Sequence, residues 1–126
     1  MIPGSCLCGA IRLVISGDLG PITACHCTQC RKTSGHYAAS FDVEDESRLK
    51  LTGTLRWYRL ASGAQRAFCG TCGSKVGFRD AAGNLSVEAG IIDGPTGSRL
   101  TEHIFTACKG DYYVIADDAH QAADRG

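Results

Sequence analysis

The sequence has no long hydrophobic run and no surplus of charge of either sign, and both absences narrow the class of protein. Its 126 residues include 13 basic and 13 acidic side chains, so the formal net charge at pH 7 is zero. Proteins that bind nucleic acid normally carry a clustered basic surface, so no nucleic-acid partner is expected. The apolar runs are only a few residues long, far too short to cross a bilayer, so no membrane partner is expected either.

Two further absences concern targeting and helices. Residues 1–6, Met-Ile-Pro-Gly-Ser-Cys, lack the basic segment followed by an apolar segment that marks a secretory signal, so we expect a cytoplasmic protein. No stretch keeps a 3.6-residue apolar period, which argues against long helices. The length suits one domain, assigned to residues 1–116, and the polar stretch 117–126, which has no aromatic residue, is expected to be a frayed tail without a function of its own.

Cysteine, by contrast, is abundant, with eight residues in this short chain. In a secreted protein they would suggest four disulfides. Here Cys6 and Cys8 are separated by one residue, as are Cys25 and Cys27, and the cytosol keeps most thiols reduced. The cysteines therefore indicate metal binding rather than disulfide bonding.

The stretch from Cys25 to Gly35 places three thiols, those of Cys25, Cys27 and Cys30, within six residues. Thiolates this close repel one another unless a cation lies between them, and Zn²⁺ is the usual cation for such ligands. Three protein ligands leave one coordination position for a substrate, as in reactive zinc sites. A fourth protein ligand would instead make the site purely structural. The spacing alone leaves both alternatives open.

Four residues bear on that choice. Cys108, His36 and His103 are candidates for a fourth ligand, although Cys108 is more simply a small buried hydrophobic residue and either histidine a core residue. His26 lies between two ligands, so its side chain is expected to point away from the metal, with a proton shuttle as the other hypothesis.

A second cysteine pair, Cys69 and Cys72, has Cys-x-x-Cys spacing with glycines beside it. With Cys6 and Cys8 it would complete a four-thiolate site that joins the N-terminus to the middle of the chain. Closing so long a loop constrains the unfolded chain, so we assign this site as structural. A redox pair would need a helix N-terminus to stabilise the thiolate, and residues 73–76 do not look helical.

Short strands separated by regular turn residues indicate an all-β fold. A single turn of helix is compatible with the residues after Cys27. Four aromatic residues on the expected strands, Trp57, Tyr58, Phe68 and Phe78, are interpreted as core. The expected strands are residues 11–16, 22–24, 37–41, 49–51, 55–60, 65–68, 76–78, 85–89 and 103–105.

The order of these motifs resembles the glutathione-dependent formaldehyde-activating enzyme family. The resemblance covers nearly the whole chain to about residue 115 and rests on seven cysteines with their flanking Gly and Ser-Gly residues. The matching motifs are Gly4-Ser5-Cys6-x-Cys8-Gly9-Ala10, Cys25-His26-Cys27-x-x-Cys30-Arg31-Lys32-x-Ser34-Gly35, Phe68-Cys69-Gly70-x-Cys72-Gly73 and His103-Ile104-Phe105.

The resemblance implies an all-β, Mss4-like β-tent of short antiparallel strands with zinc knuckles and two Zn²⁺ ions. Cys6, Cys8, Cys69 and Cys72 would hold the structural zinc, and Cys25, Cys27 and Cys30 the catalytic one. The activity implied is that of a carbon–sulfur lyase acting on a small thiol adduct, which condenses glutathione with formaldehyde to S-hydroxymethylglutathione.

Two points stay open beside that resemblance. Arg31 and Lys32 follow the site and could receive the glutathione carboxylates, or they could simply ease the thiolate charge from a solvated loop. The alternative function, from a different class, is a non-catalytic zinc β-domain that serves as a macromolecular binding module.

Overall fold

The computed structural model describes residues 1–125 and consists mostly of short strands. Apart from one α-helix, α1 (Thr28–Ser34), the helical segments are three single turns of 3₁₀-helix, η1 (Glu46–Arg48), η2 (Ala89–Ile91) and η3 (Thr106–Cys108). The strands are β1 (Ile2–Ser5), β2 (Arg12–Ile15), β3 (Ile22–Cys25), β4 (Ala38–Val43), β5 (Leu49–Thr52), β6 (Leu55–Arg59), β7 (Gln65–Cys69), β8 (Lys75–Arg79), β9 (Leu85–Glu88), β10 (Leu100–Ile104) and β11 (His120–Gln121). The all-β prediction is therefore confirmed.

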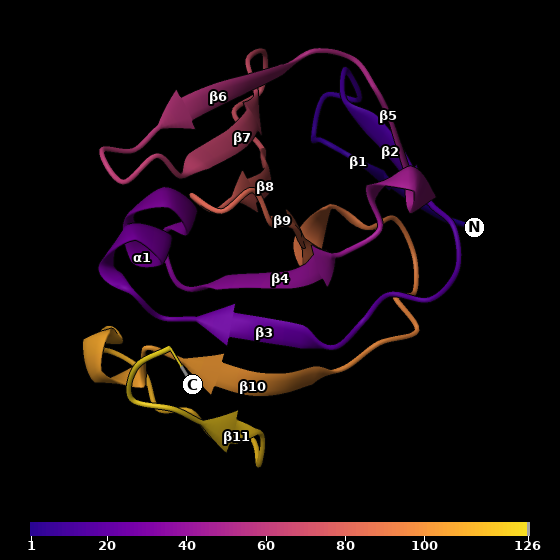
Figure 1. Ribbon diagram of the computed structural model, residues 1–126. Coiled ribbons are helices and arrows are strands. Elements are labelled where there is room, and N and C mark those ends of the chain that lie inside the picture. The colour runs from indigo at the N-terminus through magenta and orange to yellow at the C-terminus, as the bar shows by residue number, and fades with distance from the viewer. Residues whose placement is uncertain (126) are drawn as a thin grey trace.

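The strands form two open sheets, which Figure 1 shows from one side. The smaller sheet has the order β1-β2-β5, and the larger has the order β11-β10-β3-β4-β9-β8-β7-β6. Most neighbours are antiparallel, as expected, but β10 pairs in parallel with both β3 and β11. The parallel pairs arise because the chain returns to β3 after six intervening strands and places β10 on its free edge.

The hydrophobic core lies between one face of the large sheet and the small sheet. Strand β3 shows how period-two alternation divides the residues: Ile22 and Ala24 are buried in the core, while Thr23 and Cys25 point to the opposite face. Leu13 and Ile15 of β2 come from the small sheet and join Phe41 of β4 in the same cluster. The outer face of the large sheet is thereby free to carry polar and sulfur side chains.

Helix α1 is two turns long, longer than the single turn compatible with the sequence. It begins at Cys27, whose sulfur accepts a hydrogen bond from the backbone N–H of Cys30 at 3.3 Å. It ends at Gly35, which has a left-handed φ of 81° and donates its N–H to the Arg31 carbonyl. The helix is therefore defined by a cysteine at one end and a glycine at the other, both within the motif predicted to bind metal.

Two predictions about burial are wrong. Trp57 and Tyr58 were expected in the core but are 41% and 62% exposed. Their strand, β6, is the last strand of the large sheet and pairs only with β7, and four of its five residues are exposed, so neither of its faces is packed into the core. Cys108, expected to be a buried small residue, is exposed in the turn η3.

The C-terminal segment also differs from the frayed tail that was expected. β11 pairs with β10, and residues 122–124 accept backbone hydrogen bonds from Phe105, Thr106 and Ala107 at 2.7–3.2 Å. Figure 1 shows the segment folded back beside β10. A polar composition without aromatic residues did not prevent docking, because the docking uses the backbone.

In the part of the chain that the structure describes, no helix has the length and apolarity needed to cross a membrane.

Deleting the chain from residue 117 onward should lower the melting temperature by several degrees, because it leaves the backbone N–H groups of residues 105–107 without protein partners. Differential scanning fluorimetry would measure the change. Asp118→Ala is the matched control, since this exposed residue can be replaced without disturbing the backbone pairing. A truncated protein as stable as the full chain would contradict the prediction.

Candidate metal centres and cleft

The first cysteine cluster joins the two sheets. Cys6 and Cys8 follow β1 of the small sheet, while Cys69 and Cys72 lie at the turn between β7 and β8 of the large one. Their four sulfur atoms lie within 4.8 Å of one another, so they could hold a metal ion. Backbone N–H groups support the sulfurs, as Ile11 shows by donating to the Cys6 sulfur at 3.2 Å. The predicted partnership of these four cysteines is present in the structure.

The second cluster is formed by three cysteines and lies at the junction of β3 and α1. Cys25 ends β3, Cys27 caps the helix, and Cys30 lies in its first turn. Their sulfurs also lie within 4.8 Å of one another, and among the residues described no fourth His, Cys, Asp or Glu joins them. The motif therefore assembles a second place that could hold a metal ion, with three protein ligands.

The donor atoms fit tetrahedral thiolate coordination. In a tetrahedral shell with metal–sulfur bonds of about 2.3 Å, neighbouring sulfurs are about 3.8 Å apart. In the first cluster the Cys6–Cys8 and Cys8–Cys69 sulfur separations are 3.7 and 3.8 Å. All eight cysteines are free thiols, so none is diverted into a disulfide. The four-cysteine cluster could thus supply all four ligands of a tetrahedral shell, whereas the three-cysteine cluster could supply three of them.

In each cluster at least one cysteine has a lowered thiol pKa and another a raised one. Against a hydrogen bond from the backbone of Ala10, burial and the neighbouring cysteines raise the pKa of Cys8 to about 11. A hydrogen bond with Cys30 raises the pKa of Cys25. A hydrogen bond from Ser74 lowers the pKa of Cys72 to about 5. In the second cluster, a hydrogen bond with Cys25 lowers the pKa of Cys30 to about 5, with burial opposing and Cys27 and the Arg66 guanidinium adding to the shift. Each cluster therefore has a thiol that is ready to ionise at neutral pH, as a metal ligand must.

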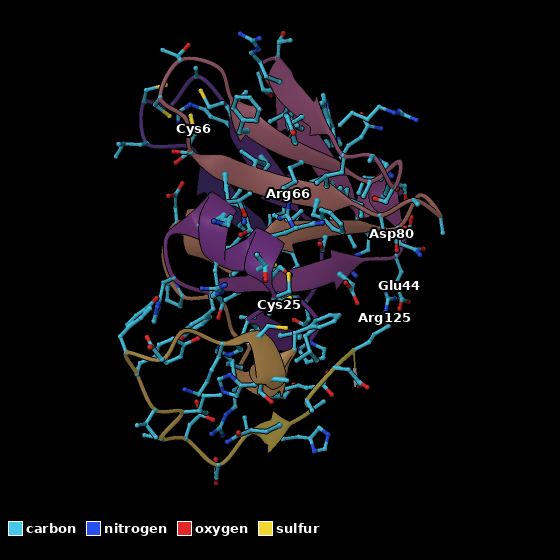
Figure 2. The ribbon with its side chains drawn as sticks, turned by 90° about the vertical axis from the view of Figure 1, so that its left-hand side faces the viewer. Cys6, Cys25, Glu44, Arg66, Asp80 and Arg125 are labelled. Carbon is cyan, nitrogen blue, oxygen red and sulfur yellow. The ribbon has the colours of Figure 1, made fainter. Side chains whose placement is uncertain are left out.

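The second cluster opens into a cleft of about 1060 Å³ on the outer face of the large sheet. Its lining includes all three sulfurs of that cluster, together with Phe78 and Ile104. The side chains that carry charge on its walls are Asp42, Glu44, Glu46, Asp80, Glu88, Glu102, Arg66 and Arg125. In Figure 2, Cys25 and Arg66 lie near the middle of the view, with Glu44, Asp80 and Arg125 along one side and Cys6 well apart. Only the three-cysteine cluster borders this cleft.

Arg66 is the cleft residue that the sequence did not predict. It is only 7% exposed, and its Nη2 donates to the Gln29 side-chain oxygen at 3.2 Å and to the Cys30 sulfur at 3.9 Å. Its guanidinium stacks on Phe78, 4.7 Å from the ring centroid. No sequence signal marks this role, because an arginine on a short strand looks like a surface residue until the facing elements are known.

The two buried histidines bind each other and not the sulfurs. The Asp117 carboxylate can only accept, so His103 Nε2–H donates to it at 3.0 Å, and in the neutral imidazole Nδ1 is then an acceptor. His26 Nε2 donates to that nitrogen at 2.9 Å, and His26 Nδ1 then accepts from the Tyr113 hydroxyl. The expectation that His26 points away from the metal agrees with this arrangement. Burial lowers the pKa of His26, which keeps the ring neutral.

The remaining candidates lie outside the second cluster. Cys108 lines the cleft but its sulfur is not grouped with the other three. His36 is at the surface, hydrogen-bonded through Nδ1 to the Tyr112 hydroxyl at 2.7 Å. Arg31 and Lys32 lie in the last turn of α1, and neither is among the described residues that line the cleft. Arg66 and Arg125 are the cations of its walls instead.

Comparison with known proteins adds to this geometry. The family model described as glutathione-dependent formaldehyde-activating enzyme matches residues 1–108, most of the chain. The chain belongs to this family. The resemblance stated from the motifs is thereby confirmed, and the match spans every cysteine, including Cys108.

Relatives of the formaldehyde-activating family are found among curated proteins. One, a candidate glutathione-dependent formaldehyde-activating enzyme of Halomonas elongata, is 34% identical over 85 residues, which cover 60% of this chain and 54% of that protein. Another, an uncharacterized lyase of Schizosaccharomyces pombe, is 29% identical over 75 residues, covering 60% of this chain and 55% of that protein. The matched region thus spans about half the length of these relatives.

The fold also has a solved counterpart. A crystal structure of a Rhodobacter sphaeroides protein superimposes with a TM-score of 0.58 and 24% sequence identity, covering 79% of this chain and 99% of that one. At that identity the likeness establishes the fold alone. The open two-sheet arrangement of this family member is therefore also found in a protein solved by crystallography.

Substituting the two clusters should have unequal effects on folding. Cys72→Ser should prevent recovery of folded, soluble protein, because a structural ion of this kind contributes on the order of 10 kcal/mol of apparent folding free energy. Cys27→Ser should leave a folded protein that holds one metal ion instead of two. Plasma emission spectrometry would give the metal content and circular dichroism the folding state. Normal stability in the Cys72 variant, or collapse of the Cys27 variant, would contradict the division of roles.

Proposed function

We propose that this protein is a zinc-dependent carbon–sulfur lyase that forms and breaks the bond between a small thiol and an aldehyde carbon. The condensation of glutathione with formaldehyde to S-hydroxymethylglutathione is the reaction proposed first, in keeping with the family. The observation that carries the proposal is the contrast between the clusters. Four cysteines form a shell away from the cleft, whereas three cysteines of matching chemistry border a cleft large enough for a tripeptide.

Zinc is the ion proposed for both clusters. Thiolate ligands in tetrahedral arrangement select Zn²⁺ among the common cations, since Mg²⁺ and Ca²⁺ prefer oxygen. All eight thiols are free, which suits a reducing compartment such as the cytoplasm. Zinc held by Cys25, Cys27 and Cys30 would supply a position where a substrate thiol is kept as a thiolate near neutral pH.

The chain's own residues would orient the substrate around that position. In the forward reaction the thiolate sulfur forms a bond to the aldehyde carbon, the carbonyl π-electrons move to oxygen, and the oxygen takes a proton. The acidic wall formed by Asp42, Glu44 and Glu102 suits the ammonium group of glutathione. Arg125, the other cation on the cleft walls, would receive a carboxylate of glutathione, a role that the sequence had suggested for Arg31 and Lys32.

The aldehyde would lie in the apolar part of the cleft. Ile104, which pairs with Cys25, and Phe78, which stacks on Arg66, line this part of the cleft and would keep bulk water from the reacting carbon. Phe105 borders the same space and has a left-handed φ of 54°, an unusual conformation for a residue with a side chain. Residues 122 and 124, which bond to the backbone of Thr106 and Phe105, hold this turn in place.

Cobalt substitution provides a direct test, because the thiolate-to-metal absorption of cobalt reports ligand exchange. Titration of the cobalt protein with glutathione should change the absorption from one of its two ions and leave the other unchanged. Exchange spectroscopy of ¹³C-formaldehyde with glutathione should then show faster formation of the adduct in the presence of the zinc protein. The Cys27→Ser variant is the control, since it should lack both responses while remaining folded.

The opposite result would favour the alternative function. If neither ion responds to glutathione or to simpler thiols, both shells are closed by protein ligands and the lyase proposal is wrong. The exposed Trp57 and Tyr58 on β6 would then fit the non-catalytic zinc β-domain, a macromolecular binding module. A response to simple thiols without preference for glutathione would keep the reaction class and change the substrate.

A further inference from the structure

Arg66 is a buried cation without a carboxylate partner. Arginine is almost never this buried unless its charge is paired. Among the residues described, the salt bridges between permanently charged side chains are Lys75–Glu88 and Arg79–Glu46, Asp117 pairs with His103, and none of these contacts involves Arg66. Its Nε is buried and makes no hydrogen bond. The contact of Arg66 with a potential anion is the one to the Cys30 sulfur, at 3.9 Å. Glu88, which is already paired with Lys75, also attracts Arg66 across the cleft, but it is not in contact with it. The group of potential anions that Arg66 contacts directly is therefore the three-cysteine cluster.

Three neighbours fix the guanidinium in that place. Phe78 faces Arg66 across the β7–β8 pair and provides the ring on which it stacks. Gln29, between Cys27 and Cys30 in the sequence, accepts from Nη2 and so ties β7 to α1. Because stacking and hydrogen bonding both restrict the side chain, Arg66 is held in a defined position and does not sample the cleft freely.

The position of Arg66 matters because a metal-loaded three-cysteine cluster would carry a net negative charge. Three thiolates and one divalent ion carry a net charge of −1, and a fourth thiolate would raise it to −2. The surrounding cleft is rich in carboxylates, which oppose the entry of an anion. A neutral ligand meets no such opposition. Without a nearby cation, the cluster should therefore prefer neutral ligands to thiolates.

We propose that Arg66 is the specificity-determining residue that allows an anionic thiolate, in preference to a neutral donor, to bind at the Cys25–Cys27–Cys30 centre. The inference rests on the proposed function, since it concerns the same open position. It assigns Arg66 a positioning and charge-balancing role through Cys30. It also identifies the substrate class as thiols that bind in ionised form, with or without a carboxylate of their own.

The experiment compares two probes of different charge on the cobalt-loaded protein. The probes are 2-mercaptoethanol, which binds as a thiolate and has no carboxylate, and imidazole, which binds neutral. Arg66→Gln should weaken mercaptoethanol binding by about 10- to 100-fold, a factor typical of losing one close charge partner, and leave imidazole binding unchanged or tighter. Arg66→Lys should retain most of the thiolate affinity. Arg59→Gln, the same charge change on the exposed strand β6, should affect neither probe.

The ratio of the mercaptoethanol affinity to the imidazole affinity is the quantity that tests the proposal, because this ratio does not depend on the fraction of protein that is folded. An unchanged ratio in Arg66→Gln, whether both affinities persist or both fall together, would overturn it. If that variant cannot be isolated, Gln29→Ala removes the group that orients Arg66 from the exposed side of α1, and a thiolate-selective loss of about 3-fold is expected. The absence of any selective loss in Gln29→Ala would then overturn the proposal.

Failure of the lyase proposal would look different. If the unmodified protein binds neither probe, the open position does not exist, and the proposed function fails together with the role of Arg66. If the unmodified protein binds mercaptoethanol and Arg66→Gln binds it equally well, the open position is real and only the inference about Arg66 is wrong.

Discussion

Mutual repulsion of clustered thiolates is the constraint on which the rest of this structure depends. Seven sulfurs lie in two groups in which all the ligand atoms are within 4.8 Å. Such groups are stable as thiolates only when a cation or donated protons balance them. The fold places each group where a cation could balance the thiolate charge. One group lies between the two sheets and the other lies at the mouth of a cleft. Strand pairing and the hydrophobic core bring the strand ends together so that these sulfurs meet.

The two clusters differ in what they connect, and this difference supports the different roles proposed for them. Cys6 and Cys8 come from the small sheet and Cys69 from the large one, 61 residues after Cys8. A metal ion there links segments that share only part of the core, which is a structural task. The second cluster lies within one strand–helix junction, so its integrity matters locally. Backbone hydrogen bonds, the Gly35 cap and the buried histidine pair already hold that junction.

The C-terminal segment takes part in this local support. Asp117 fixes the proton on His103, and through it the orientation of His26, which lies between two ligands of the second cluster. The pKa of Asp117 is lowered by the backbone N–H of Ala119 and by His103, so the carboxylate stays ionised over the physiological range. A segment that contains none of the cysteine motifs thus helps determine where Cys25 and Cys27 lie.

Local patterns predicted the three-cysteine cluster, the two cysteine pairs of the other cluster and most strands, because all of these depend on short-range spacing. Cys-x-Cys and Cys-x-x-Cys fix ligands within a turn, and β-branched residues bounded by glycine mark strands such as β2. The errors come from long-range contacts. Trp57 looked like a core residue because nothing local reveals that β6 lies at the edge of its sheet. The docking of residues 117–125 uses backbone groups of β10 and η3, which have no sequence signature.

The same limit applies to Arg66, and it shows why a cleft of this kind has to be read from the assembled structure. Arg31 and Lys32 adjoin the cysteine motif in sequence, yet the helix carries them to its last turn, away from the cleft walls. Arg66 is 36 residues from Cys30 and reaches its sulfur only because β7 and α1 face each other. The base beside the cysteine cluster is therefore Arg66, which is distant in sequence, and not Arg31 or Lys32, which follow the motif directly. In a cleft with six carboxylates on its walls, one buried guanidinium against the sulfurs has a larger effect on an entering anion than bases that lie outside the cleft, as the half-exposed Arg31 and the exposed Lys32 do.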